Sequence, residues 1–210
     1  MLRLALLCTL LATLLFGCPK APGADPALVA QLDNEVLALK AKNAQLAERL
    51  AVCDKDIGAS TEVVRQLTQV YADFEVVVER RGRLVVLVIP SALLFSENSL
   101  ELRAEAAPVL DLLGTVLGLN PAEVIWIVGY SDVGPKSSSL ARIYPGGWEW
   151  GAAQANAVRK ALVSRHGVSV TRIMVASRGD AAPRTVEGGD AAAIRAATRR
   201  VEIVFGASLP

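Results

Sequence analysis

A heptad repeat of apolar residues between Val29 and Ile57 constrains the fold of this chain more than any other feature. Position a is filled by Val29, Val36, Asn43, Leu50 and Ile57, and position d by Leu32, Leu39, Leu46 and Cys53. The pattern predicts a helix that pairs with a parallel copy of itself, because β-branched residues at a with Leu at d favour two strands and a buried Asn fixes their register. We therefore expect a homodimer through residues 28–57.

The charges beside this seam agree with a dimer. Glu35 would face Lys40 of the second copy and Arg49 would face Asp54, and both pairs are opposite in sign. Beyond Gly58 the same phase continues through Ser60, Val64, Leu67, Tyr71 and Phe74. A single amphipathic helix that folds back on its own domain is the alternative. In either case residues 27–74 are expected to be a helical spacer.

The first 17 residues have the features of an export signal. Arg3 lies near the amino terminus, and residues 4–16 are mostly apolar but fewer than the about 20 that span a bilayer. The segment ends in Leu15-Phe16-Gly17-Cys18, which resembles a bacterial lipobox. The resemblance implies that Cys18 becomes the first mature residue and carries lipid, with residues 18–26 as anchor and linker. The alternative is an ordinary signal peptide with an incidental cysteine.

Composition argues against several other classes of protein. Cleavage would remove Cys8 and lipidation would use Cys18, so Cys53 is the single thiol left and no internal disulfide framework is available. The sequence has one histidine, His166, and a single histidine does not supply the ligands of a metal site. We therefore expect no metal and no cofactor. A net charge of +1 does not suit a nucleic-acid binder, so no nucleic-acid partner is expected.

The periodicity changes at Glu75, where a globular domain is expected to begin. Residues 76–79 and 84–89 are β-rich runs joined by a charged turn, which predicts a hairpin. Further strands are expected at 124–128, 173–176 and 201–205, helices at 104–119 and 150–166, and long loops between 128 and 150 and between 176 and 201. The pattern predicts an α/β fold, a two-layer sandwich of helices on a mixed β-sheet, over residues 75–206, with a tail at 207–210.

Several blocks of sequence in this domain follow one another in a recognisable order: SALLFSENSLELRAEAAPVLDLLGTVL, GYSDVG, ANAVRKALVSRHGVSVTRI, SRGDAAP and TRRVEI. In order and spacing they resemble the C-terminal domain of the OmpA family, which is shared with the peptidoglycan-associated lipoprotein and the MotB stator proteins. The resemblance implies an OmpA-like domain that binds the peptide stem of peptidoglycan non-covalently through its diaminopimelate residue.

The resemblance also implies a binding site. A diaminopimelate side chain carries an ammonium and a carboxylate, which require an anionic acceptor and a cationic donor. Asp132, beside Ser131 at the end of the strand 124–128, matches the family's acidic residue, but Gln154 stands where the family has an arginine. A charged hydrogen bond is worth about 1.5–3 kcal/mol, so we expect weaker binding than in the family.

The missing cation has three candidate replacements, Arg142, Arg199 and Arg200, each with a solvated or purely structural role as the alternative. Arg142 belongs to a loop that is longer than the family's and that also carries Tyr144, Trp148 and Trp150. These aromatic side chains would form a wall for a ligand, a small apolar cluster or a surface for a partner protein.

The sequence therefore predicts a non-enzymatic envelope protein. Ser137–Ser139 have no histidine with an orienting carboxylate nearby, which argues against nucleophilic catalysis. The order of a lipid anchor, a spacer and a domain suits a lipoprotein that tethers the outer membrane to peptidoglycan and faces the periplasm. The absence of Asp after Cys18 favours sorting to the outer membrane. The alternative is a degenerate OmpA-like domain that binds protein as a scaffold module of an envelope complex.

Overall fold

The computed structural model describes residues 25–119 and 124–206, so the predicted signal peptide and the lipidation site Cys18 lie outside the described residues. Contacts divide the chain into two units, Met1–Ala51 and Val52–Pro210. The helices and strands are α2 (Pro26–Val70), β1 (Val77–Arg81), β2 (Leu84–Pro90), α3 (Ser91–Leu94), α4 (Ala106–Leu119), β3 (Ile125–Tyr130), α5 (Ser138–Ile143), α6 (Gly147–His166), η1 (Val170–Arg172), β4 (Ile173–Gly179), α7 (Ala191–Thr198) and β5 (Arg200–Phe205).

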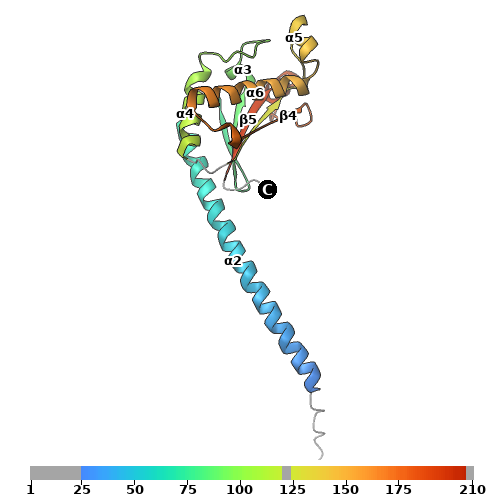
Figure 1. Cartoon of the computed structure of the whole chain (residues 1–210). Helices are drawn as coiled ribbons and strands as arrows, with labels where there is room; N and C mark the ends of the chain where they lie inside the picture. Colours follow the sequence, from blue (N-terminus) through green and yellow to red (C-terminus); the bar gives the residue numbers. More distant parts are fainter. Residues whose placement is uncertain (1–24, 120–123, 207–210) are drawn as a thin grey trace, which may run out of the picture. The chain divides into compact units, whose positions relative to one another are not determined.

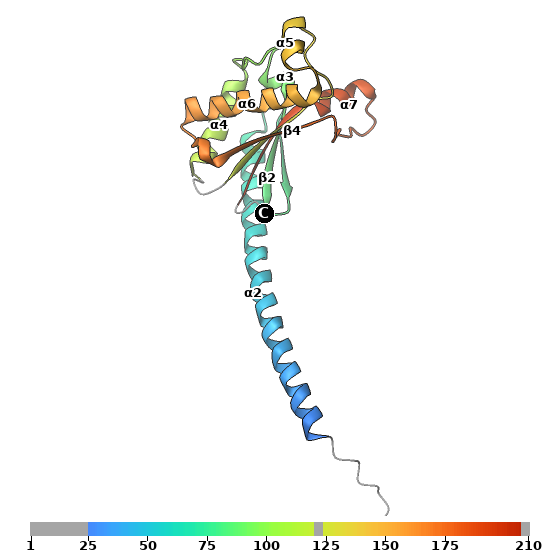
Figure 2. The ribbon, with the colours of Figure 1, turned by 45° about the vertical axis from the view of Figure 1, so that its right-hand side comes forward.

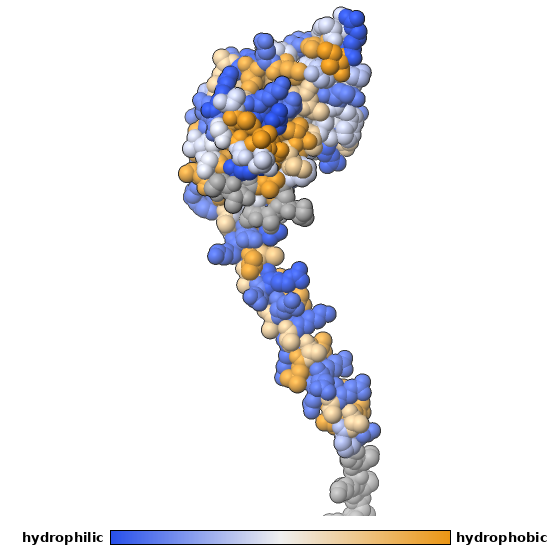
Figure 3. Space-filling view, viewed as in Figure 1, coloured by the Kyte–Doolittle hydropathy of each residue, from blue (hydrophilic) through white to orange (hydrophobic). Residues whose placement is uncertain are grey.

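The predicted long helix is present as α2. Asp25 caps it, because its Oδ1 accepts a hydrogen bond from the amide of Ala27 at 2.9 Å, and Pro26 suits the first turn of a helix. Gly58 does not interrupt α2, which continues to Val70. The apolar side chains of the seam between Val29 and Ile57 are 37–63% exposed. Figure 3 shows apolar surface recurring along this helix among polar residues.

The last turns of α2 pack into the globular domain. Leu67 and Tyr71 are 5% and 1% exposed, and the hydroxyl of Tyr71 donates to the carbonyl of Val109 at 3.1 Å. Val64 and Phe74 pack partly buried against the same core. The heptad phase therefore enters an intramolecular core at Leu67 and Tyr71, whereas the apolar seam residues from Val29 to Ile57 are exposed. The helix ends at Val70, and the chain turns at residues 71–75 before it enters β1.

The five strands form one mixed sheet in the order β1-β2-β5-β3-β4. β3 and β4 run parallel, and the other three neighbouring pairs are antiparallel. The predicted hairpin is β1–β2, with Gly82 at φ 64° in its turn. The last strand, β5, lies between β2 and β3, and Arg200 at its start pairs with Tyr130 at the end of β3.

One face of the sheet is covered by α4 and α6 (Figures 1 and 2). Alternate residues of the central strands point to this face, as the two-residue period of a strand requires. The core comprises Val85, Leu87 and Ile89 of β2, Ile125 and Ile127 of β3, Val201, Ile203 and Phe205 of β5, Val109, Leu110, Leu113 and Leu117 of α4, and Ala155, Val158 and Leu162 of α6. The predicted α/β sandwich of helices on a mixed sheet, preceded by a long helix, is confirmed.

Two short helices lie where the sequence predicted only loops. α7 begins after Asp190, whose Oδ1 accepts hydrogen bonds from the amides of Ala192 (2.9 Å) and Ala193 (2.8 Å). An Asp before an alanine-rich run is a helix start signal that the prediction overlooked. α5 begins after Ser137, which makes no side-chain capping bond, so its sequence carries a weaker signal.

Candidate functional site

Close contact between glycines brings the start of α6 against the end of β3. A Cβ atom at Gly129 would clash with the carbonyl of Gly151, and one at Gly147 would clash with the carbonyl of Ser131. Only glycine lets the two backbones approach this closely. As a result, the residues that follow β3 lie beside the first turns of α6, which carry Gln154.

A cavity of about 390 Å³ opens beside this contact, and we call it the Gln154 cavity. Its walls come from α3 and the loop after it, the loop after β3, the first half of α6, and the end of α7 with the residue before β5. Its polar lining residues are Ser91, Ser96, Glu97, Asn98, Arg103, Ser131, Lys136, Gln154 and Arg199. Three of the predicted site residues, Ser131, Gln154 and Arg199, therefore line one cavity.

Asp132 pairs with Arg199 next to this cavity. The Nε of Arg199 donates to Oδ1 of Asp132 at 2.6 Å, and its Nη2 donates to Oδ2 at 3.3 Å. The Asp132 side chain is 16% exposed and that of Arg199 is 43% exposed. The sheet explains the pairing, because Asp132 follows the end of β3 and Arg199 precedes the start of the adjacent antiparallel β5.

Gln154 is buried at the cavity, at 5% exposure. Its Oε1 accepts a hydrogen bond from the hydroxyl of Ser91 at 3.3 Å, and the amide of Ser91 donates to the carbonyl of Arg199 at 2.9 Å. Ser91 thus links Gln154 to the backbone of Arg199. Ser131 is also buried, but its hydroxyl closes a local turn by donating to the carbonyl of Val133 at 2.7 Å.

Two loops are tied together at the rim of the cavity by contacts that sequence reasoning missed. The amide of Lys136 donates to Oδ1 of Asn98, and its Nζ donates to Oε1 of Glu97, both at 2.7 Å. The hydrogen bond from Lys136, together with the nearby charge of Arg199, lowers the pKa of Glu97. Asn98 adopts a left-handed φ of 56°, a conformation that Asn tolerates better than most residues. The SENS sequence marked a loop but not its contact with Lys136.

Arg200 does not line the Gln154 cavity. Arg200 is the first residue of β5, and strand alternation places it on the same side as Glu202, two residues further along. Its Nε donates to Oε1 of Glu202 at 2.8 Å, with side-chain exposures of 6% and 1%, and its guanidinium carbon lies 3.7 Å from the ring centre of Tyr130. Burial alone would raise the pKa of Glu202, but hydrogen bonds from Arg81 and Arg200 outweigh it and lower that pKa. This arrangement is that of a structural ion pair.

The longer loop places its aromatic residues in different surroundings. Trp150 is 7% exposed, lines the cavity, and lies 5.7 Å from Tyr144 between ring centres. Trp148 is 51% exposed, and its ring leaves no room for a Cβ atom at Gly179. Arg142 donates from Nε to the carbonyl of Ser138 at 3.3 Å and does not line the Gln154 cavity. Tyr144 and Trp150 thus pack together, whereas Trp148 keeps an exposed surface.

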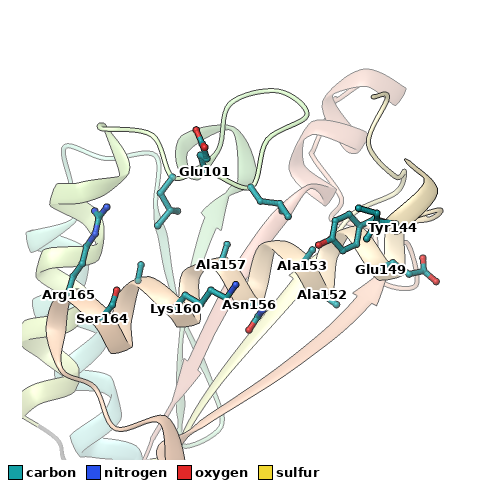
Figure 4. Close-up of a pocket in the computed structure, with 14 residues that line it drawn as sticks. Glu101, Tyr144, Glu149, Ala152, Ala153, Asn156, Ala157, Lys160, Ser164 and Arg165 are labelled. Atoms are coloured by element: carbon teal, nitrogen blue, oxygen red, sulfur yellow. The ribbon is translucent and has the colours of Figure 1, made fainter. Parts of the chain in front are cut away.

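A second, larger hollow of about 810 Å³ runs along the outer side of α6 and is shown in Figure 4. Ala153, Ala157 and Asn156 lie on its helical wall, with Tyr144 at one end and Arg165 at the other. None of the predicted site residues lines this α6 groove. The Gln154 cavity, which collects Ser131, Gln154 and Arg199, is therefore the candidate site.

Two general properties bear on the site. Among residues 25–119 and 124–206, no group of three or more His, Cys, Asp or Glu side chains is arranged to hold a metal ion. In the same ranges no helix combines the length and the apolar character needed to cross a membrane.

The fold of this chain is similar to those of several solved structures. A MotB-like protein from Desulfovibrio vulgaris is 22% identical with a TM-score of 0.64, over 76% of this chain and 98% of that one. The cell wall anchor of the T6SS from Pseudomonas aeruginosa is 28% identical with a TM-score of 0.57, over 68% and 97%. The periplasmic domain of Helicobacter pylori MotB is 24% identical with a TM-score of 0.55, over 64% and 81%.

A comparison with curated protein sequences gave no match. The model of the OmpA family matches residues 94–197, which run from the end of α3 to α7 and include β3, β4 and α6. Most of the residues that line the Gln154 cavity fall within this match, and so does Asp132 beside the cavity. The globular part of this chain is therefore a domain of the OmpA family.

Proposed function

We propose that this chain is an outer-membrane lipoprotein whose OmpA-family domain tethers the envelope by binding peptidoglycan non-covalently in the Gln154 cavity. The bound group would be the peptide stem at its diaminopimelate residue. The binding residues would be Ser131, Asp132, Gln154 and Arg199. Arg200, which also belonged to the predicted site, would support it only indirectly, through its ion pair with Glu202.

The observation that carries this proposal is the Asp132–Arg199 pair beside the cavity, at 2.6 Å. A carboxylate and a guanidinium together are the chemistry that a zwitterionic amino-acid head requires. Gln154 contributes no charge, so Arg199, the residue before β5, would supply the cation that the family places on this helix. The similarity to a T6SS cell wall anchor at 28% identity supports attachment to the wall.

The membrane end of the proposal rests on the sequence. Residues 1–17 would be the signal peptide, Cys18 the lipid-bearing residue, residues 18–26 the linker and residues 27–74 the spacer before the domain at 75–206. The intact protein should fractionate with membranes and incorporate a labelled fatty acid. Cys18→Ser should abolish both. Recovery of the unaltered protein from the soluble periplasmic fraction would refute lipid anchoring.

Self-association through residues 28–57 is the third part of the proposal. The seam side chains of α2 are exposed in the single chain, including Leu32 at 50% and Leu50 at 63%. A parallel second copy would cover them, pair Asn43 with its equivalent, and set Glu35 against Lys40. Exposed apolar rows of this regularity are typical of partner surfaces.

Retention on purified peptidoglycan sacculi tests the wall-binding function. The mature chain, made soluble by Cys18→Ser, should sediment with insoluble sacculi in a saturable way. Asp132→Ala should reduce retention, because Arg199 then loses its partner. Arg142→Ala is the matched control, since Arg142 is also a loop-region arginine but does not line the cavity. Failure of the folded, unaltered protein to sediment would contradict the proposal.

A protein-binding scaffold is the second candidate function. It is favoured by exposed apolar side chains on the longer loop and around α5: Val133 at 44%, Ile143 at 65% and Trp148 at 51%. Large aromatic residues at the surface commonly anchor protein interfaces. If the protein is not retained on sacculi, a photo-crosslinking residue placed at position 148 in cells should capture an envelope protein. Ile143→Asp should then reduce the yield of the crosslinked product.

A further inference from the structure

The two outer strands of the sheet, β1 and β4, differ in how their free edges are protected. β1 carries three charged residues in a row, Glu79, Arg80 and Arg81, and charged side chains commonly keep an edge strand from pairing with another chain. β4 has a single charged residue, Arg178, and no proline. Within residues 25–119 and 124–206 its outer edge pairs with no other strand. β4 is therefore an edge that is open to a further strand.

Apolar side chains are exposed along this edge. Met174 and Val175 are 47% and 37% exposed, and Val170, just before β4, is 52% exposed. Val175 points to the face of the sheet that α6 covers, because it pairs with a core residue of β3, and Met174 points to the opposite face. Trp148, which is 51% exposed, packs at the other end of β4. Apolar surface thus borders the edge on both faces and at both ends.

We propose that β4 pairs antiparallel with β4 of a second copy, across a two-fold axis at Val175, so that the two sheets join into one. This contact is separate from the Gln154 cavity and from residues 28–57, and it goes beyond the proposed function. In this register Met174 faces Ala176 of the second copy. Because antiparallel pairing reverses one strand, Val170 of each copy lies towards Trp148 of the other. The exposed apolar side chains of the edge are then self-complementary, as a closed two-fold interface requires.

The position of α6 fits the same arrangement. α6 packs on both β3 and β4, on the covered face of the sheet (Figure 2). Neighbouring strands lie about 4.8 Å apart, so two helices that each lie over β3 and β4 would be about two strand spacings, or about 10 Å, apart. Packed helices have interaxial distances of about 8–10 Å. The joined sheet therefore sets α6 at packing distance from its equivalent and covers Val175.

The charges of α6 are complementary in this pairing. Glu149 lies in the first turn of α6 and Arg165 in its last turn; both are exposed, and neither forms an ion pair within the described part of the chain. The two-fold axis sets α6 antiparallel to its equivalent, so the acidic end of each helix lies towards the basic end of the other. The two helix dipoles are opposed as well, which is favourable. A second copy therefore matches this edge in charge as well as in apolar surface.

Disulfide crosslinking tests the contact. A chain of residues 18–210 with Cys18→Ser and Cys53→Ser has no other thiol. Val175→Cys then places a thiol opposite its equivalent, at a Cα separation of about 4.5–5.5 Å that a disulfide can span. Val77→Cys is the matched control, because Val77 is a 47% exposed valine of the other edge strand, β1. Mild oxidation should link Val175→Cys into a dimer and leave Val77→Cys mostly monomeric. Equal yields would overturn the proposal.

Mixing two variants tests the register. Met174→Cys and Ala176→Cys should form a disulfide-linked heterodimer when mixed, whereas neither should link to itself, because the antiparallel register sets one position opposite the other. Self-linking of Met174→Cys without a heterodimer would rule out the two-fold axis at Val175.

A charge reversal tests the packing of α6. With Val175→Cys present, Glu149→Lys should lower the yield of the disulfide by placing like charges together, and adding Arg165→Glu should restore it. A double variant that links no better than Glu149→Lys alone would overturn the antiparallel placement of α6. Retention on sacculi is a separate measurement, so the failure of this contact and the failure of wall binding are distinguishable.

Discussion

Removal of the last turns of α2 should destabilise the domain, although the change of periodicity places the domain boundary at Glu75. Leu67 and Tyr71 are 5% and 1% exposed and belong to the same core as β2, α4 and α6. Truncation of a buried Leu costs about 2–5 kcal/mol and of a buried aromatic residue about 3–5 kcal/mol. A fragment of residues 75–210 should therefore be less stable than one of residues 52–210 by at least about 5 kcal/mol, which is as much as many domains possess.

Urea unfolding monitored by circular dichroism measures this difference. The fragment 52–210 should unfold cooperatively, and the fragment 75–210 should be largely unfolded without urea. Two substitutions in the longer fragment measure the separate contributions of Leu67 and Tyr71 to the free energy of unfolding. Leu67→Ala should cost about 2–5 kcal/mol, and Tyr71→Phe about 1 kcal/mol through the lost hydrogen bond to Val109. Val52→Ala, at a side chain that is 55% exposed, is the control and should change stability by less than about 0.5 kcal/mol. Equal urea midpoints for the two fragments would refute the reasoning.

Three further predictions concern association, binding and pH. Cys53 is an exposed free thiol at position d, so a disulfide-linked dimer should appear on non-reducing electrophoresis and vanish in Cys53→Ser; a monomer in sedimentation at micromolar concentration would contradict it. Gln154→Arg should tighten binding to sacculi by about 1.5–3 kcal/mol by adding a second cation beside Arg199; unchanged binding in a folded variant would show that this position does not reach the ligand. The pKa of Glu202 is lowered from the ordinary 4.5, so its carboxylate stabilises the fold at pH values above 4.5. This contribution is lost as the pH falls from 4.5 through the lowered pKa. The urea midpoint should therefore decrease over this pH range, and Glu202→Gln should make the decrease smaller.

The regular parts of the fold could be read from local sequence. The helix α2 follows from the heptad period of its apolar side chains, and the hairpin β1–β2, the helices α4 and α6 and the strands β3 to β5 follow from local apolar runs between turn residues. The predicted boundaries were less accurate. The helix expected at 150–166 begins at Gly147, and the strand expected at 173–176 extends to Gly179. α5 and α7 were missed because six to eight residues carry too little periodic signal.

The same apolar phase has two different uses along α2, and the sequence could not separate them. Leu32 and Leu67 both occupy position d of one heptad register, yet Leu32 is 50% exposed and Leu67 is 5% exposed. What buries Leu67 is the core of the sheet and α4, which comes from residues far along the chain. Sequence periodicity indicates that a face is apolar, but only the tertiary structure decides what covers it.

The candidate site shows the same division. The resemblance to the OmpA family selected Ser131, Asp132 and Gln154 by motif position, and Arg142, Arg199 and Arg200 were candidates by charge. The sequence could not choose among these three arginines. The insertion of β5 beside β3 brings Arg199 to Asp132 across 67 residues of chain, and the alternation of a strand sends Arg200 to Glu202 instead. Strand order and register are set by long-range pairing, so the partner of each charge was decided only by the folded structure.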